Sequence, residues 1–269
     1  MFTVTSYPHG AFSWVDCSSS DANARHFYAS LMGWNIEEAP MGGGLTYYTF
    51  LKDGHRVAAL SELPPQMAHL PPSWNSYVTV DDVDALAPRV GDLGGAVLQE
   101  PFDVFHNGRL LMCQDPQGAA ISFWQANNHI GAGLVNTPGA LCWNELWTAD
   151  PQASRTFYGG LLGWEFEDLV YDPERPAYNW IRNNGRSNGG LFAMDDGAAA
   201  NRSPGWIPYF SVADIELSAA RAVGLGGELL SGLEEHSDGG RAMLISDPQG
   251  AQCYLIKVHE PEPWIEHVT

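Results

Sequence analysis

The sequence has little positive charge. Of its 269 residues, 13 are Lys or Arg and 32 are Asp or Glu, which gives a formal net charge of −19, and Lys52 and Lys257 are the only lysines. Because so acidic a surface repels phosphate backbones and anionic lipid, we expect neither a nucleic-acid partner nor a membrane partner. No apolar run approaches the ~20 residues of a membrane span, and the first residues lack the basic and apolar regions of a secretory signal. These absences predict a cytoplasmic protein.

Metal-binding spacing is missing as well. The four cysteines, Cys17, Cys113, Cys142 and Cys253, form no CxxC pair, and each lies in a strand-like stretch. We therefore expect buried free thiols in a reducing compartment. The nine histidines show neither HxH nor HxxxH spacing. The segment Gly42–Gly44 lacks the Lys and the following helix of a phosphate loop, so it predicts a strand–strand turn.

Apolar and aromatic residues, in contrast, are plentiful. Hydrophobic residues make up 45% of the chain, which is enough to build a core, and the length is ordinary for two domains. Ten residues are Trp. They either fill the core and its edges or line a pocket for a flat apolar ligand.

The chain repeats itself. An Asp-Pro-Gln-Gly-Ala segment begins at Asp115 and again at Asp247, and a Phe-Tyr pair followed by Leu-x-Gly-Trp begins at Phe27 and again at Phe157. A nearly constant offset between matching residues is what duplication of a domain leaves behind. We therefore predict two domains, residues 8–126 and 138–258. Further matching pairs are Trp14 and Trp143, Trp74 and Trp206, Tyr77 and Tyr209, Gly95 and Gly227, and Arg109 and Arg241.

Each domain divides into two similar units. In the first unit, a strand pattern around Trp14 precedes a helix with an apolar face that includes Phe27 and Leu31, and three strand-like runs follow. The polar run 18–21 is expected to cap this helix, and Asp82 to cap the helix of the second unit. The pattern predicts four βαβββ units. This is an α+β fold in which two units form a curved mixed sheet with helices outside and a concave inner face.

These motifs resemble the vicinal oxygen chelate superfamily, in particular its two-domain, glyoxalase-like members. The superfamily includes glyoxalase I, extradiol ring-cleaving dioxygenases, fosfomycin-inactivating enzymes and bleomycin resistance proteins. The resemblance rests on the Phe-Tyr…Leu-x-Gly-Trp helix end and the Asp-Pro-x-Gly turn, each present twice, and it covers nearly the whole chain. It implies the fold of two glyoxalase-like domains. It leaves the activity open, because the same scaffold hosts lyases, oxygenases, transferases and binding proteins.

The resemblance also implies where a metal would bind. Metal-dependent members take His, Gln or Glu ligands from the first and last strands of these units. Trp, Ile, Ser and Tyr do not make a usual divalent-metal site, so we expect no metal and no other cofactor here. The corresponding positions in this chain are Trp14, Asn75 and Ser122 in the first domain and Trp143, Ile207 and Tyr254 in the second.

One acid in each domain lies on the same face as these positions. Asp16 and Glu145 follow Trp14 and Trp143 by two residues, so each shares a strand face with its Trp. They are the candidate catalytic residues, because a carboxyl in an apolar pocket has a raised pKa and can act as an acid, a base or a hydrogen-bond acceptor for a ligand. Alternatively, each is a structural acid bonded to neighbouring groups.

The concave faces suggest a ligand. A surface of Trp and Tyr with one carboxylate fits an aromatic or otherwise flat small molecule, although the same side chains would also fill a curved sheet. The candidate ligand-binding residues are Trp14, Asn75, Tyr77, Ser122, Trp124, Trp143, Tyr209 and Tyr254.

Three functions stay open at this point. The first is a metal-independent protein that binds or sequesters such a ligand, resembling the bleomycin resistance branch. The second is a glyoxalase-like lyase or ring-modifying enzyme, either with an unusual metal site or with Asp16 or Glu145 as acid or base. The third is a structural module with degenerate pockets. Two domains in one chain mimic the dimer of single-domain relatives, so we expect a monomer or a homodimer.

Overall fold

Two curved sheets form the body of the protein. The computed structural model describes residues 2–169, 178–195, 197, 202–235 and 240–258. The first sheet has eight strands in the order β3-β4-β5-β2-β6-β9-β8-β7. These are β2 (Phe12–Ser19), β3 (Asn35–Gly42), β4 (Leu45–Lys52), β5 (His55–Glu62), β6 (Ser73–Thr79), β7 (Ala96–Val104), β8 (Gly108–Gln114) and β9 (Ala120–Ala126).

The second sheet repeats this arrangement. Its order is β12-β13-β14-β11-β15-β19-β18-β16, and β17 also pairs with β18. The strands are β11 (Leu141–Thr148), β12 (Glu165–Leu169), β13 (Tyr178–Asn183), β14 (Arg186–Ala193), β15 (Gly205–Ser211), β16 (Glu228–Leu229), β17 (Glu234–Glu235), β18 (Arg241–Ser246) and β19 (Gln252–Lys257). A separate ribbon pairs β1 (Phe2–Thr3) with β10 (Leu134–Val135).

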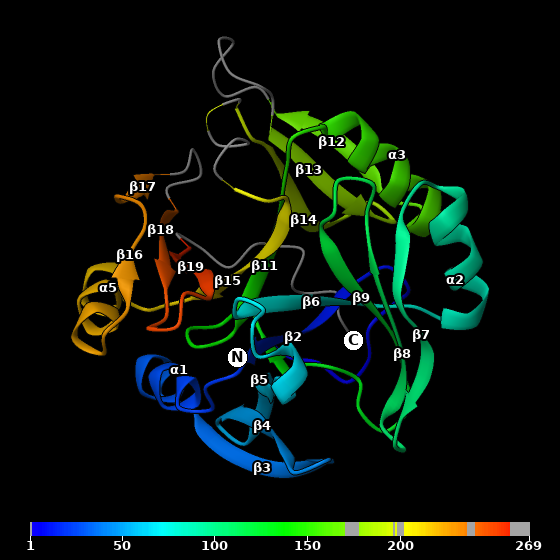
Figure 1. The fold of residues 1–269 in the computed structure, drawn as a ribbon. Coiled ribbons are helices and arrows are strands. Elements are labelled where there is room, and N and C mark those ends of the chain that lie inside the picture. Colours follow the sequence, from blue (N-terminus) through cyan, green and yellow to red (C-terminus); the bar gives the residue numbers. More distant parts are fainter. Residues whose placement is uncertain (1, 170–177, 196, 198–201, 236–239, 259–269) are drawn as a thin grey trace.

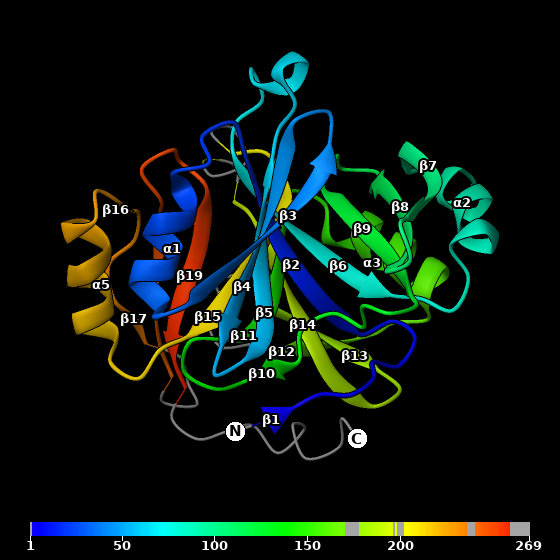
Figure 2. The same ribbon diagram turned by 90° about the horizontal axis from the view of Figure 1, so that it is seen from below.

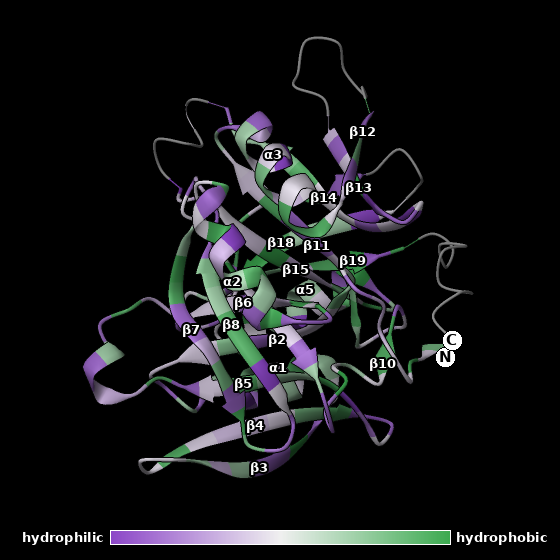
Figure 3. Cartoon of the chain, turned by 90° about the vertical axis from the view of Figure 1, so that its right-hand side faces the viewer, coloured by the Kyte–Doolittle hydropathy of each residue, from purple (hydrophilic) through white to green (hydrophobic). Residues whose placement is uncertain are grey.

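One α-helix follows the first strand of every unit, so the four predicted βαβββ units and the α+β fold are confirmed. The helices are α1 (Ala24–Met32), α2 (Val83–Asp92), α3 (Pro151–Leu162) and α5 (Ile215–Gly224), and a short 3-10 helix covers Pro65–Met67. Figure 3 shows α2 and α3 with both hydrophilic and hydrophobic bands, as amphipathic helices require. None of the helices in the described part of the chain combines the length and apolar character needed to cross a lipid bilayer.

Of the two helix N-caps predicted from the sequence, one is confirmed. Asp82 accepts the backbone N–H of Ala85 at 3.0 Å, as expected for an N-cap. The polar run 18–21, however, does not cap α1, and that prediction was wrong. The N-cap position of α1 is Asn23, which makes no side-chain capping bond. Asp21 instead accepts the backbone N–H of Asn23 at 2.9 Å, in a turn that precedes the helix.

One other predicted feature is confirmed. All three glycines of Gly42–Gly44 have positive φ and connect β3 to β4, so this segment is a strand–strand turn.

The repeated arginines have equivalent partners in the two domains. Arg109 donates from Nε and Nη2 to Asp84 at 2.8 Å each. Arg241 contacts Glu216 in the equivalent way. Each arginine therefore ties a strand to the first turn of a helix.

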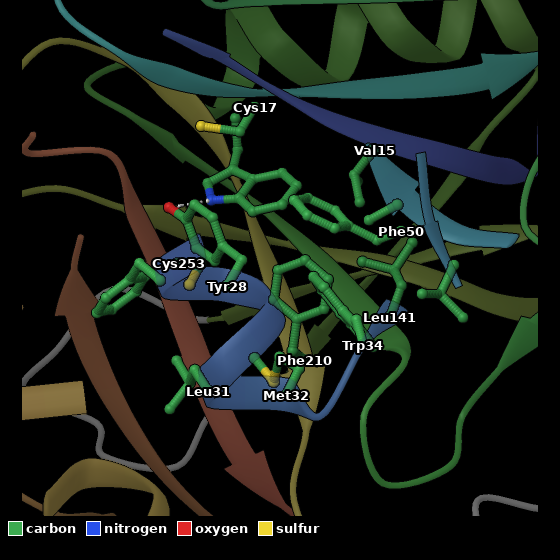
Figure 4. Close-up of a cluster of buried hydrophobic side chains, with 14 of the residues drawn as sticks. Val15, Cys17, Tyr28, Leu31, Met32, Trp34, Phe50, Leu141, Phe210 and Cys253 are labelled. Atoms are coloured by element: carbon green, nitrogen blue, oxygen red, sulfur yellow. Dashed lines mark hydrogen bonds between the residues drawn. The ribbon is translucent and has the colours of Figure 1, made fainter. Parts of the chain in front are cut away.

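The helices pack across the domain boundary. Figures 1 and 2 show α1 of the first domain beside α5 of the second, and α2 of the first beside α3 of the second. Each helix pair, together with the outer faces of strands from both sheets, encloses one hydrophobic core. One core combines Tyr28 and Phe50 with Phe210 and Cys253, and Figure 4 shows these side chains in one buried cluster. The main cores therefore lie between the domains.

A buried hydrogen-bond chain joins the two domains inside this core. The Tyr28 hydroxyl of α1 donates to Asp247 Oδ2 of the second domain at 2.9 Å, and the Trp74 indole donates to the Tyr28 hydroxyl at 3.1 Å. Asp247 Oδ1 accepts three backbone N–H groups of its own turn. One carboxylate thus fixes both a tight turn and the neighbouring domain.

The other half of the molecule carries the equivalent contacts. The Trp206 indole donates to the Tyr158 hydroxyl at 2.8 Å, and this hydroxyl lies beside the Asp115 carboxyl of the first domain and interacts with it electrostatically. Burial raises the pKa of Asp115 above its ordinary value, and the surrounding hydrogen bonds partly offset this rise. The repeated Tyr and Asp residues are therefore partners of each other across the domain boundary.

The remaining repeated residues serve the same boundary. The Trp34 indole donates to the Gly139 carbonyl at 2.7 Å, and the Trp164 indole donates to the Gly10 carbonyl at 2.9 Å. Each bond runs from the helix end of one domain to the segment that leads into the other. The close approach of the two domains also requires glycine at position 95, because a Cβ on Gly95 would lie 2.6 Å from the Phe157 ring of the second domain.

We expect Tyr28→Phe to destabilise the protein. The variant leaves buried Asp247 Oδ2 without this donor and the Trp74 indole without this acceptor, so the free energy of unfolding should fall by about 1–3 kcal/mol. Urea denaturation followed by fluorescence measures the change. The control is Tyr48→Phe, whose hydroxyl donates to the partly exposed Glu62 at 3.2 Å; it should cost less than about 1 kcal/mol. Equal losses in the two variants would show that the cross-domain bond has no special weight.

Candidate functional site

The register of the central strands brings the candidate residues together. Trp14 lies opposite Tyr77, which pairs with Ser122, and Asp16 lies opposite Asn75. In the second domain, Trp143 lies opposite Tyr209, which pairs with Tyr254. Each concave face therefore carries a row of residues over three neighbouring strands, with one acid next to the row.

In the first domain this acid is enclosed. Asp16 is 3% exposed. Its carboxylate accepts hydrogen bonds from Asn75 Nδ2 at 2.8 Å, from the Tyr77 hydroxyl at 2.7 Å and from the Tyr47 hydroxyl at 3.2 Å. Burial raises the pKa of Asp16, and the three hydrogen bonds partly offset this rise. The Trp14 indole donates to the Tyr47 hydroxyl at 3.0 Å, which extends the network.

The segment that joins the two domains covers this concave face. The His129 ring meets the Trp14 ring edge-on at a centroid distance of 4.7 Å, and the His129 carbonyl accepts the Trp124 indole N–H at 2.7 Å. Burial lowers the pKa of His129 to about 4, so the ring is neutral near pH 7. Ala132 is fully buried in the same cluster. The first concave face is therefore filled by the protein's own chain.

The second concave face has different partners around its acid. Glu145 is 6% exposed, and its Oε1 accepts the Trp147 indole N–H at 2.6 Å and the Tyr209 hydroxyl at 3.0 Å. Tyr209 stacks on Tyr254 with a centroid distance of 4.2 Å and an interplanar angle of 10°. Trp143 and Trp147 are only partly buried. This face therefore presents aromatic rings around a carboxylate and leaves two of them accessible.

Several residues of this face were not among the predicted ones. Trp143 donates its indole N–H to the Tyr178 hydroxyl at 3.0 Å and meets Trp180 edge-on at 5.6 Å. The Arg202 guanidinium lies 3.9 Å above the Trp147 ring. The sequence held one signal for them, because Trp147 extends the Trp-x-Glu pattern to Trp-x-Glu-x-Trp in the second domain alone.

A separate cleft of about 100 Å³ lies where the domains meet. Cys142 and Trp143 line it, together with Asn183 and Asn188. The two asparagines donate to the backbone carbonyls of His9 and Gly10 at 2.8 and 2.9 Å. Because these side chains fasten the segment before β2, the cleft belongs to the domain contact.

The cysteines are free thiols, as predicted. Cys17, Cys113 and Cys253 are buried, whereas Cys142 is partly exposed, so the expectation of burial was wrong for that residue alone. Burial raises the pKa of Cys113 to about 12. These thiols are therefore protonated near pH 7.

Comparison with known proteins agrees with the resemblance. Residues 18–123 match the model of the glyoxalase/bleomycin resistance protein/dioxygenase superfamily, and residues 141–256 match that of a glyoxalase-like domain. The chain belongs to this superfamily. It is 36% identical over 260 residues to "Putative glyoxylase CFP32" of Mycobacterium tuberculosis, covering 96% of this chain and 97% of the relative.

Two further proteins are similar along their length. The anthracycline biosynthesis protein DauV of Streptomyces sp. (strain C5) is 32% identical over 277 residues, covering 97% of this chain and 98% of that protein. The Mn(II)-bound glyoxalase from Novosphingobium aromaticivorans has a TM-score of 0.62 at 16% identity, covering 94% of this chain and 83% of that one. At 16% identity, this similarity shows a shared fold and nothing about a shared activity.

The residues present do not fit the metal that this fold holds elsewhere. A divalent ion needs two or three converging oxygen or nitrogen donors. On the concave face of the second domain, the row over the three neighbouring strands is instead Trp143, Tyr209 and Tyr254. Burial raises the pKa of the Tyr209 hydroxyl well above its ordinary value, so it remains protonated. The described residues contain no group of three or more His, Cys, Asp or Glu side chains placed to hold a metal ion. His236, His259 and His267 lie outside the described residues.

We expect Asp16→Asn to change how stability depends on pH. The raised pKa means that the folded state binds this proton more tightly than the unfolded chain, whose Asp pKa is about 3.9. The stabilising contribution of the proton is therefore complete below about pH 4 and is lost as the pH rises through the folded pKa. The free energy of unfolding of the wild type minus that of the variant should fall over this range, by ~1.4 kcal/mol per unit of pKa difference.

Urea denaturation at a series of pH values measures this difference. Asp214→Asn, at the exposed cap of α5, is measured alongside as the surface control. A difference that stays flat or increases with pH for Asp16→Asn would contradict a pKa that burial raises in the folded state.

Proposed function

We propose that the protein binds an aromatic or otherwise flat small molecule without a metal, on the concave face of its second domain. We keep residues 8–126 and 138–258 as the proposed bounds of the two domains. In this proposal the first domain serves as scaffold, because the joining segment fills its concave face. The second domain holds or sequesters the ligand.

One observation carries this proposal. The buried Nε1 of Trp180 finds no hydrogen-bond partner within the described residues. It lies beside the partly exposed Trp143, on the face that also holds Trp147 and Glu145. Buried polar groups are almost always hydrogen-bonded, so an indole N–H without an acceptor beside partly exposed aromatic rings favours a ligand that offers an acceptor there. The rings supply stacking surface and the polar groups supply orientation.

One relative, DauV, is named an anthracycline biosynthesis protein. An intracellular location stays a prediction, supported by four cysteines without a disulfide.

An enzymatic role is the second candidate, since one relative bears the name of a glyoxylase. Glu145 would then act as acid or base, because it lies on the more accessible face, whereas Asp16 is enclosed. Such a role requires that the protein convert the bound compound. A fall in the concentration of the added compound over time would show this conversion.

We expect the neutral planar compound 2-naphthamide to bind to the wild type in isothermal titration calorimetry. Trp147→Leu should weaken this binding roughly tenfold, since losing one stacking wall costs about 1.4 kcal/mol. The matched control is Trp14→Leu in the first domain, which should lower stability but leave the affinity unchanged. Absence of binding by the wild type across a panel of planar compounds would leave the structural-module hypothesis as the better one.

Metal removal should not change this affinity. We expect the protein dialysed against EDTA to bind 2-naphthamide as tightly as the protein supplied with Mn²⁺, Fe²⁺, Ni²⁺ or Zn²⁺, because neither concave face presents a suitable donor set among the described residues. Elemental analysis of the purified protein accompanies the titration. A stoichiometric metal whose removal abolishes binding would overturn metal independence.

A further inference from the structure

Arg202 is an unusual cation on the concave face of the second domain. It is half-buried, lies over Trp147, and donates from Nη2 to Gln252 Oε1 of β19. Gln252 and Tyr254 are two residues apart on one strand, so they share the concave face. The guanidinium is thereby held at the rim of the ring cluster that surrounds Glu145.

The charge of Arg202 is poorly matched by its surroundings. Burial lowers the pKa of its guanidinium, and interactions with Tyr254, Glu145 and Tyr209 partly offset this fall. No carboxylate among the described residues lies within ion-pair distance of Arg202, although its guanidinium is half-buried. A guanidinium has five N–H donors, and the hydrogen bond to Gln252 uses one of them.

The duplication shows that this cation was added to one domain. Aligning the Pro and Trp of 70–74 with those of 202–206 places Leu70 at the position of Arg202. The same alignment places Ala120 at the position of Gln252, and Ser18 corresponds to Trp147. The guanidinium, the amide that holds it and the ring beneath it therefore occur together in the second domain and are all absent from the first.

We propose that Arg202 is the specificity-determining residue of the second concave face and selects flat ligands that carry an anionic oxygen group, such as a carboxylate or a phenolate. The inference rests on the proposed binding function. The donor of Trp180, which also lacks an acceptor in the described structure, points to the same acceptor-rich chemistry. The net charge of −19 repels an anionic ligand at long range. A partly desolvated guanidinium attracts the same ligand at short range through charge-assisted hydrogen bonds.

The test compares 2-naphthoate with 2-naphthamide, which have the same ring and differ in charge. Calorimetric titrations at pH 7 and about 0.15 M salt should show the wild type binding 2-naphthoate at least tenfold more tightly. Arg202→Gln should remove this preference by weakening 2-naphthoate at least tenfold while changing 2-naphthamide less than about threefold. Arg202→Lys, which keeps the charge, should retain part of the preference.

Arg25→Gln is the matched control, because Arg25 lies 4.6 Å above the Tyr48 ring in the first domain. It should leave both affinities unchanged. Circular dichroism verifies that each variant is folded. Equal affinity of the wild type for the two compounds, or an equal loss for both in Arg202→Gln, overturns the role of Arg202 while the binding function stands. Failure of the wild type to bind either compound overturns the binding function and this inference together.

Discussion

The buried Asp247 carboxylate is the point on which the rest of the structure depends. One oxygen organises its own turn, and the other accepts the hydroxyl of Tyr28 from the opposite domain. A buried acceptor without its donor is costly, so the turn, the helix and the domain boundary stabilise one another. The two sheets, which share no strand, are joined through this contact and its counterpart at Tyr158.

A shared boundary of this kind separates stability from function. Helices and outer strand faces are committed to the cores between the domains, and substitutions there affect both halves at once. The concave faces lie on the opposite side of each sheet, so they can diverge without disturbing the cores. The two faces have done so: Asp16 is enclosed by Asn75, Tyr47 and Tyr77, whereas Glu145 is surrounded by indoles and a nearby guanidinium.

The sequence predicted the strands, the helices and the duplication, because periodicity and repeated motifs report local structure directly. It did not predict that Tyr28 and Asp247 are partners. A repeat shows that a Tyr and an Asp occur in each domain, but it does not show whether the Tyr contacts the Asp of its own domain or that of the other. The interactions of Trp34 and Trp164 were hidden for the same reason. Arg202 and His129 were missed because neither residue is repeated. Leu70 takes the place of Arg202 in the first domain, and His129 lies in the joining segment, so a search for matching pairs passes over both.

The joining segment has a further consequence for competition. His129 and Ala132 occupy the first concave face while the chain tethers them at both ends, so they act as an internal occupant at an effective concentration in the millimolar range. A freely diffusing molecule would have to overcome that local concentration as well as replace the bond between His129 and Trp124. Covalent connection of the domains therefore makes the two faces unequal in their accessibility to a molecule from solution, even before their side chains differ.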